Sequence, residues 1–372
     1  MSVPLKDEIR IQPHGSHSGL NKLLVFVTLE APRRKDQDLL CCFFAIPEHP
    51  PHFYSESNTK VADSNGYLKV FFSTAKDGSI DIRVGRDTVG DVVLTLEVTP
   101  RPVNQLTSPR TYTELHSDQG GLIGVGRWFL PHIPCREIST CHVEWDLSLS
   151  PPTTKASWSF GEGAELTTQT GPDDLVRSSV FMAETDEAEP PVIHCFGQLP
   201  ASLRLLQEST APIFSYAKSL FESPESVMKV YIRKVPRGFS GHNFACCFMI
   251  DYSDLDQPRH EAELLRYMSH EMTHNWAYLG NDPDGFQNTW FIEGIADFYA
   301  LYLPVMAGVK GVEYFCQILD EFLTMYYTSP YLHTPLRQVP NDANGNLVSY
   351  RRGFMYLFLL DAQLRAVAES RG

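Results

Sequence analysis

Two histidines with a glutamate between them are the residues of this 372-residue chain whose spacing most directly suggests chemistry. His270 and His274 belong to a His-Glu-x-x-His run, and residues i and i+4 lie on one face of a helix. The two imidazoles can therefore hold one metal ion, and such nitrogen ligands favour zinc. Glu271, one residue after the first histidine, can take a proton from a water molecule that the metal activates.

Two acidic residues further along complete the predicted centre. A catalytic zinc needs a third protein ligand and an open position. Glu293 follows His274 after eighteen intervening residues, enough for one helix to end and a second to return. Asp297 comes one helical turn later, where it can accept the free N–H of a ligating histidine. The prediction is one zinc ion on His270, His274 and Glu293. The alternative, a surface helix with solvated histidines, fits poorly with the apolar flanks of both segments.

Helices must bring these residues together. Apolar spacing predicts a helix over residues 261–279, ended by Gly280, and a second from residue 288 or 289 to about 303, before Pro304. Other helical patterns cover residues 203–221 and 309–327, and a strand is expected over 227–235. A turn-rich loop over 340–346 precedes a last helix that starts at Tyr350.

The sequence pattern of the first half of the chain predicts strands rather than helices. Short apolar and β-branched runs separated by Gly and Pro predict strands at residues 23–29, 39–46, 67–72, 80–84, 92–98 and 142–147. Residues 13–19 are expected to form a loop, in which His14 and His17 are surface histidines rather than metal ligands. These patterns divide the chain into a β-sheet domain over residues 1–200 and a catalytic domain over residues 201–372.

Composition narrows the possible partners. The net charge of −14 argues against nucleic acid and anionic membranes as partners, and no apolar run approaches the length of a membrane span. The polar N-terminus is unlike a signal peptide. The eight cysteines include two adjacent pairs and suggest reduced, buried thiols. We therefore expect a cytoplasmic protein whose partner is a small peptide or another small molecule; the oligomeric state is not indicated.

The run from His270 to Trp276 and the Trp-Phe-Ile-Glu-Gly run that ends at Gly294 resemble the gluzincin metallopeptidases. The sequences of these two motifs are most similar to those of the glycyl aminopeptidase family. Leucyl-type aminopeptidases and leukotriene hydrolase share the same motif spacing. The resemblance implies an α+β fold: an N-terminal antiparallel β domain, then a thermolysin-like mixed α/β catalytic domain. It also implies zinc ligation by His270, His274 and Glu293, with Glu271 as general base.

Two further segments resemble these families. Tyr350 begins a Tyr-x-x-Gly run before an apolar helix, which matches the catalytic tyrosine; its phenol would stabilise the oxyanion. The stretch with Gly241, His242 and Asn243 matches an edge strand that binds substrate. In the families this strand carries a glutamate for the substrate's free amine, but no acidic residue occurs here between Gly238 and Ile250. His242 and Asn243 therefore either contact substrate or only fix the edge strand.

Three functions remain open. The favoured one is a zinc aminopeptidase or small-peptide hydrolase. The second is a zinc enzyme that acts on a non-peptide, such as an epoxide, an amide or a biosynthetic intermediate. The absent carboxylate favours this option, as does a chain that ends at Gly372 where the resembled families continue. The third is a non-catalytic binding or scaffold protein, which would have no need of Glu271.

Overall fold

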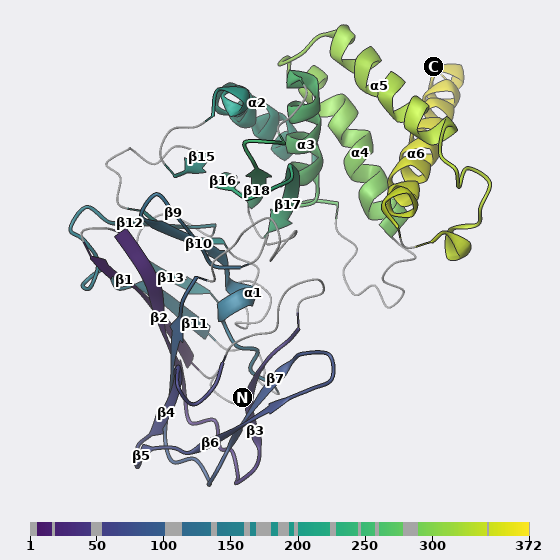
Figure 1. The fold of residues 1–372 in the computed structure, drawn as a ribbon. Helices are drawn as coiled ribbons and strands as arrows, with labels where there is room; N and C mark the ends of the chain where they lie inside the picture. The colour runs from purple at the N-terminus through teal and green to yellow at the C-terminus, as the bar shows by residue number, and fades with distance from the viewer. Residues whose placement is uncertain are drawn as a thin grey trace.

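A computed structural model describes residues 6–16, 19–45, 54–100, 114–134, 140–159, 164–168, 180–184, 193–196, 200–223, 228–244, 247–256, 260–277, 289–340 and 342–371. Over these residues the protein is a mixed α/β structure with four sheets and six α-helices. Three of the sheets come from the first half of the chain, and the long helices come from the second half (Figure 1).

The largest sheet has seven strands in the order β13-β11-β1-β2-β8-β4-β5. Its neighbouring strands are antiparallel except for β1 and β11, which run parallel. Buried and less buried residues alternate along β2 and β8, so one face of the sheet packs on the core and the other is more exposed to solvent. The bounds are β1 (Lys6–Ser16), β2 (Gly19–Leu29), β4 (Thr59–Asp63), β5 (Gly66–Tyr67), β8 (Val92–Val98), β11 (Thr140–Trp145) and β13 (Glu165–Thr168).

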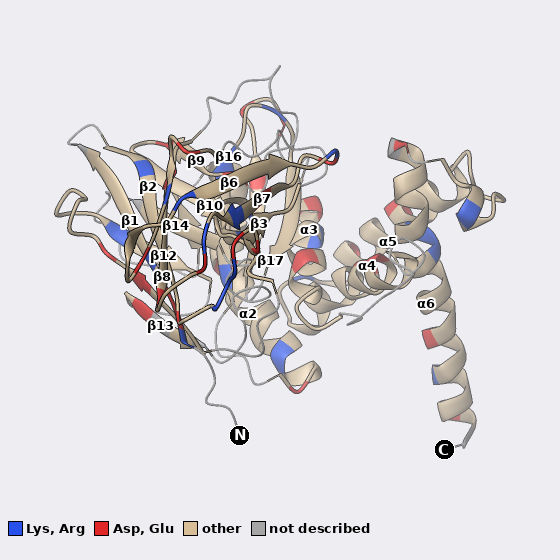
Figure 2. Cartoon of the chain, turned by 90° about the horizontal axis from the view of Figure 1, so that it is seen from below, with Lys and Arg blue, Asp and Glu red and all other residues tan. Residues whose placement is uncertain are grey.

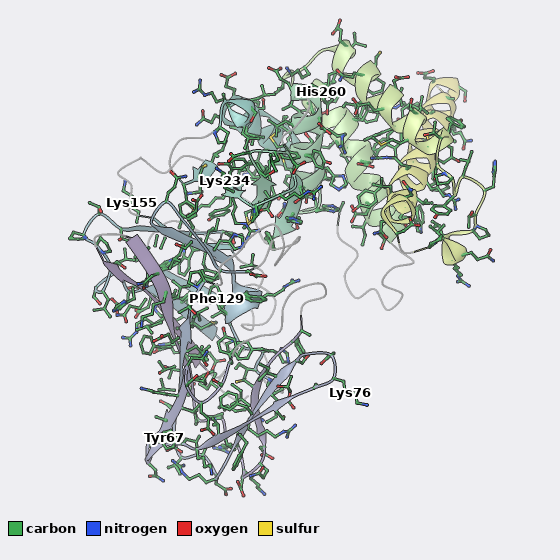
Figure 3. All side chains as sticks on the ribbon, in the orientation of Figure 1. Tyr67, Lys76, Phe129, Lys155, Lys234 and His260 are labelled. Carbon is green, nitrogen blue, oxygen red and sulfur yellow. The ribbon has the colours of Figure 1, made fainter. Side chains whose placement is uncertain are left out.

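Two smaller sheets complete the N-terminal half. One has the order β3-β7-β6 and the other β12-β14-β10-β9. Their apolar side chains join those of the large sheet in one core, which includes Phe129 (labelled in Figure 3). Phe129 meets Phe181 edge to face, with 5.3 Å between the ring centroids. The bounds are β3 (Leu39–Phe43), β6 (Val70–Thr74), β7 (Ile80–Val84), β9 (His116–Asp118), β10 (Gly121–Val125), α1 (Gly126–Phe129), β12 (Lys155–Trp158) and β14 (Val180–Glu184).

The fourth sheet carries one strand of the predicted site. Its order is β15-β16-β18-β17, with parallel pairs β15–β16 and β16–β18 and an antiparallel pair β17–β18. The bounds are β15 (Ile193–Cys195), β16 (Lys229–Lys234), β17 (Ser240–Phe244) and β18 (Cys247–Tyr252). β17 is the last strand in this order, so the predicted edge strand is found at an edge. Through Tyr231 and Met249 one face of this sheet packs on β10 and β14.

The helices cover the other face of this sheet. Their shared core includes Leu264, Leu265, Met268 and Met272, all fully buried. The bounds are α2 (Leu205–Leu220), α3 (Glu261–Thr273), α4 (Thr289–Met306), α5 (Val312–Tyr327) and α6 (Ala343–Arg371). The end of α6 projects away from the rest of the chain (Figure 2), and its residues 362–370 are exposed. The domain boundary between residues 200 and 201 stays a prediction.

Two local predictions about these elements are wrong. Residues 13–16 belong to β1 rather than to a loop, and His14 pairs with Lys22 of β2; His17 lies outside the described residues. The helix expected to stop before Pro304 continues to Met306. Proline lacks the N–H that would bind the carbonyl of Ala300, and the Tyr314 hydroxyl donates to that oxygen instead, at 2.8 Å.

The last helix also starts earlier than predicted. Asp342 caps it: one of its carboxylate oxygens accepts from the N–H of Gly345 at 2.7 Å, and its carbonyl accepts from Asn346. Residues 343–346, expected to be a loop, therefore form the first turn of α6, and Tyr350 lies two turns inside the helix rather than at its start.

Within the described residues, no helix is long and apolar enough to cross a membrane. Of the six described cysteines, Cys41, Cys42, Cys141 and Cys247 are buried, Cys195 is half-buried and Cys316 is exposed. Cys135 and Cys246 lie outside the described residues.

Candidate metal centre

The helix α3 has strong local reasons to form. His260, at its N-terminal end (Figure 3), accepts a hydrogen bond through its ring from the N–H of Glu263 at 3.1 Å. Glu261 and Glu263 lie in the first turn, where negative charge is favoured by the helix dipole. Its apolar side packs into the helical core, so α3 is fixed at both its start and its buried face.

The two histidines sit at the other end of α3. His270 lies in the last turn, and His274 is the residue that ends the helix while keeping a right-handed helical backbone. The helix predicted to reach residue 279 is therefore too long. The N–H groups of Asn275 and Trp276 donate instead to the carbonyl groups three residues earlier, those of Met272 and Thr273. Residues 278–288, which include Gly280, lie outside the described residues.

Three ligand atoms meet between α3 and α4. His270 Nε2 and His274 Nε2 are 3.2 Å apart, and Glu293 Oε2 lies 3.1 Å and 3.4 Å from them. These residues form a group that could hold a metal ion. A tetrahedral zinc site with ligands at about 2.0–2.1 Å has edges of about 3.3–3.4 Å between ligand atoms. The triangle observed has nearly that size, so the donor set fits zinc in both chemistry and geometry.

The charges of the centre depend on one another. Burial alone would lower the pKa of His270, but hydrogen bonds to Asp297 and Glu293 raise it to about 10. Burial would raise the pKa of Glu293, yet its bonds to His270 and His274 lower that pKa to about 2. Without a metal the three groups therefore hold a proton among themselves. A zinc ion would replace that proton and be attracted by the same carboxylate.

Asp297 contacts His270 at the ring nitrogen that does not face Glu293 and His274. Its Oδ1 lies 3.0 Å from His270 Nδ1, on the side of the ring away from the ligand nitrogen. Asp297 is fully buried, and burial would raise its pKa, but Arg351 and His270 keep that pKa below its ordinary value. The predicted role of Asp297 thus has the required geometry: it fixes the ring and directs Nε2 towards Glu293.

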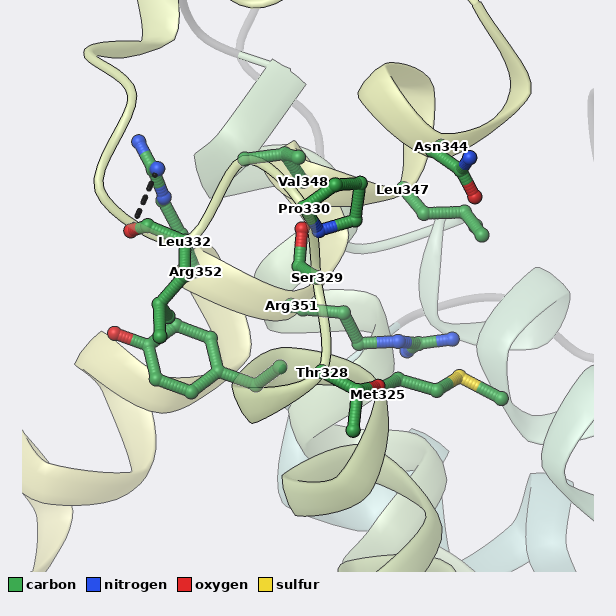
Figure 4. Close-up of a pocket in the computed structure, with 11 residues that line it drawn as sticks. Met325, Thr328, Ser329, Pro330, Leu332, Asn344, Leu347, Val348, Arg351 and Arg352 are labelled. Atoms are coloured by element: carbon green, nitrogen blue, oxygen red, sulfur yellow. Dashed lines mark hydrogen bonds between the residues drawn. The ribbon is translucent and has the colours of Figure 1, made fainter.

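Arg351 is a residue that the sequence reasoning missed. Its Nη1 donates to Oδ2 of Asp297 from α6, and only 5% of the residue is exposed. Arg351 also lines a cavity of about 160 Å³ between the end of α5 and the first half of α6, near Met325 and Val348 (Figure 4). A sequence signal did exist: Arg351 is a charged residue at an inward position of an apolar helix, one residue after the candidate tyrosine.

The candidate general base, Glu271, lies against the edge strand. Glu271 is 93% buried, and Gly241 of β17 leaves the space that its carboxylate occupies. A methyl group added at Gly241 would come within 2.6 Å of the Glu271 Cγ and 2.8 Å of Oε1. Asn243, two residues along the same face, donates from Nδ2 to the backbone carbonyl of Glu271 at 3.2 Å. Both residues therefore position α3 against β17.

His242 faces the other side of the same strand. Its Nε2 is 3.0 Å from Ser240 Oγ and 3.7 Å from Oδ2 of Asp251 on β18. Side chains alternate along a strand, so His242 points away from Glu271 where Gly241 and Asn243 point towards it. Gly241 and Asn243 therefore face α3, as predicted for residues of the site. His242 faces the opposite side, so only its backbone lies near α3.

Tyr350 completes the group from α6. Its ring stacks on that of His270, with centroids 5.8 Å apart and an angle of 13° between the planes. Burial and the nearby carboxylates of Glu293, Glu271 and Asp297 raise the pKa of the phenol well above its ordinary value. The phenol is therefore protonated at neutral pH and can donate a hydrogen bond. Of the predicted site residues, His242 points its side chain away from this region and Gly241 has no side chain; the others direct their side chains into it.

No protein-family model matches the sequence, and no curated protein matches it. Solved structures do match. An aminopeptidase N family protein from Idiomarina loihiensis is 15% identical over 98% of this chain and 67% of its own, with a TM-score of 0.69. The M1 zinc metallopeptidase from Deinococcus radiodurans is 16% identical over 94% of this chain and 79% of its own, with a TM-score of 0.53.

Leukotriene A4 hydrolase from Saccharomyces cerevisiae has the same fold, with 11% identity over 97% of this chain and 59% of its own, and a TM-score of 0.57. Identities this low establish the fold alone. The chain therefore has the fold that M1 zinc metallopeptidases and leukotriene A4 hydrolase share, as the resemblance to gluzincins implied. The finer resemblance to glycyl aminopeptidases stays a prediction.

Proposed function

We propose that this protein is a zinc-dependent hydrolase that cleaves amide bonds of small peptides, most simply as an aminopeptidase. The observation that carries the proposal is the triangle of His270 Nε2, His274 Nε2 and Glu293 Oε2, with sides of 3.1–3.4 Å. One zinc ion would be held there. Glu271 and Tyr350 stand beside the triangle on two different elements, which is the arrangement that attack on a carbonyl group requires.

Each residue then has one task. When bound, zinc supplies a Lewis acid that lowers the pKa of water and polarises a carbonyl group. Glu271 takes the proton of the attacking water and later passes it to the leaving amine. Tyr350 donates its phenol hydrogen to the carbonyl oxygen as negative charge develops on it. Asp297 and Arg351 keep the imidazole of His270 in one orientation.

The edge strand supplies the proposed substrate-binding surface. An extended peptide can add to an open sheet edge through backbone hydrogen bonds, and β17 is the edge strand beside Glu271. We assign this contact to the backbone of Gly241, His242 and Asn243. The Deinococcus radiodurans metallopeptidase, which has the same fold, has been solved with a Tyr-Ser-Ala substrate. This supports a short peptide as the substrate class here.

A second candidate function has its own supporting observation. No acidic residue occurs between Gly238 and Ile250, so the edge strand offers no carboxylate to a charged amine. A site of that kind would accept an uncharged substrate, and one structure with this fold is named a leukotriene A4 hydrolase. Hydrolysis of a non-peptide such as an epoxide or amide is therefore the alternative.

A substrate panel separates these functions. The zinc content of the purified protein would be measured, and the zinc-loaded protein assayed with matched aminoacyl amides, free or acetylated at the amine, and with an alkyl epoxide. One zinc per chain with preference for the free amines supports the aminopeptidase. Equal turnover of blocked and free substrates, or turnover of the epoxide alone, supports the second function. One zinc per chain with no turnover would favour the binding or scaffold protein and contradict both.

A further inference from the structure

Two glycines meet where the helices α4 and α6 cross. A methyl group added at Gly353 would overlap the carbonyl oxygen of Trp290 and come within 2.8 Å of the Cα of Gly294. One added at Gly294 would come within 2.5 Å of the Gly353 carbonyl carbon and 2.9 Å of the Phe354 nitrogen. All these atoms belong to the backbone, which cannot yield as a side chain can. The two helices are therefore closer at this point than any other residue would allow.

The crossing lies among the residues of the metal centre. Gly294 directly follows Glu293 on α4, and Gly353 lies within one turn of Tyr350 and Arg351 on α6. Figure 1 shows the two helices side by side. Contacts from α6 to the metal centre depend on this separation: Arg351 donates to Asp297 of α4, and the ring of Tyr350 stacks on His270 of α3.

We propose that Gly353 is a positioning residue that sets the distance between the Tyr350 phenol and the metal centre. All three ligand atoms come from α3 and α4, whereas the phenol comes from α6. A larger residue at position 353 would separate α6 from α4 and withdraw the phenol, while His270, His274 and Glu293 stay together. The inference rests on the proposed function, because it assigns the phenol a task in turnover.

The substitution Gly353→Ala tests this in the zinc-loaded protein. We expect one zinc per chain, little change in KM, and a fall in kcat of about 10²–10³-fold, as for the loss of an oxyanion donor. Tyr350→Phe should cause a loss of the same order. If Gly353 acts through the phenol, the double variant loses no more activity than Tyr350→Phe alone. Multiplied losses in the double variant, or an unchanged kcat in Gly353→Ala, would overturn the inference.

A matched control comes from the N-terminal sheet. A methyl group at Gly15 would also meet backbone, within 2.7 Å of the Cα of Leu20, but between β1 and β2. Gly15→Ala should lower stability and leave the kcat of the folded protein unchanged.

Should Gly353→Ala fail to fold, Tyr356→Ala replaces it, because the ring of Tyr356 on α6 meets that of Trp290 on α4, with 5.6 Å between their centroids. It should lower kcat several-fold, but not in a Tyr350→Phe background; an unchanged kcat contradicts the inference.

A readout without substrate separates this inference from the proposed function. With 3-fluorotyrosine at position 350, zinc binding should shift the fluorine resonance of the otherwise unchanged protein, and shift it less in Gly353→Ala. A reduced shift in a protein that hydrolyses no substrate of the panel would keep the positioning role and reject the proposed function. An equal shift in both proteins would reject the positioning role, whatever the activity.

Discussion

The metal centre and the ion pair of Arg233 with Asp251 lie on opposite faces of the same four-stranded sheet. Both combine arginine, carboxylate and histidine in a buried place, and Arg233 and Asp251 are 0% and 4% exposed. Arg233 donates to both oxygens of Asp251, each at 2.9 Å, so the pair is complete in itself. In the metal centre Arg351 balances Asp297, and Glu293 is left facing two imidazole nitrogens that need a proton or a cation.

The difference shows what distinguishes a metal site from a structural ion pair. In the ion pair each of the three guanidinium nitrogens of Arg233 has an acceptor, because Nη1 donates to the carbonyl of Glu114. The nearby His242 is only an outer neighbour of Asp251, at 3.7 Å. In the metal centre three potential ligand atoms converge instead, and a proton or a cation is needed to hold them together. A surplus of converging ligand atoms, rather than buried charge as such, therefore marks the site that can do chemistry.

The largest effect expected on the chemistry comes from Glu271→Gln. This change keeps the shape of the side chain and removes the base, so turnover should fall by about 10³-fold or more while bound zinc stays at one per chain. Steady-state kinetics and zinc analysis of the same preparation would measure both. A variant that retains full activity would show that the centre is no more a catalytic site than the ion pair is.

The ion pair should behave in the opposite way. Arg233→Met leaves Asp251 buried without its partner and should lower the free energy of unfolding by about 3–5 kcal/mol, with zinc content and kcat of the folded protein unchanged. The double variant Arg233→Met/Asp251→Leu should recover most of that loss. Urea unfolding of the zinc-loaded proteins would measure both. Loss of zinc in the single variant would mean that the two clusters are coupled through the sheet.

The pH dependence of stability gives the sign of the Asp251 contribution. Burial would raise its pKa, but Arg233 and His242 hold the pKa below its ordinary value of about 3.9. A carboxyl group with a depressed pKa stabilises the folded state above its unfolded pKa, and this contribution is lost as the pH falls further. The stability advantage of the unchanged protein over the Arg233→Met/Asp251→Leu variant should therefore decrease as the pH falls below about 4.

Local spacing explains why the sequence could predict that the proposed metal ligands lie close together. His270 and His274, like Glu293 and Asp297, are four residues apart on one helix, so the geometry of a helix places each pair without knowledge of the fold. The ion pair could not be predicted, because Arg233 and Asp251 meet only through the parallel register of β16 and β18. The same holds for the side on which His242 lies, which depends on the phase of the edge strand.

The fold, like the site, could be predicted only where local sequence patterns determine it. Alternating apolar residues predicted several strands of the first half, but not β1 or its parallel pairing with β11, which joins segments more than a hundred residues apart. The start of α6 was missed because its cap, Asp342, stands in a stretch whose Asn and Gly residues are typical of loops. A tertiary contact decides the pairing of β1 with β11, and Arg351 was missed for the same reason, because its partner Asp297 lies 54 residues away; the start of α6 depends instead on a local cap.

Asp297→Asn weakens the metal centre without removing a ligand. The amide can no longer accept from His270 and pair with Arg351 as a charged group does, so zinc affinity should fall by about 10–100-fold. Competition with a chelator of known affinity would measure it. Asp361→Asn is the matched control, because Asp361 pairs with Arg365 along α6, at 2.8 Å. Equal zinc affinity in both variants would remove the role assigned to Asp297.

The smallest effect should separate the two faces of β17. Asn243→Ala removes one hydrogen bond to the carbonyl of Glu271, worth about 1 kcal/mol, so kcat should fall roughly fivefold with zinc content unchanged. Ser240→Ala removes a hydroxyl from the opposite face, where it contacts His242, and should leave kcat unchanged. If both variants lower kcat alike, the strand acts as one rigid unit; if only Asn243→Ala does, its side chain holds the general base in place.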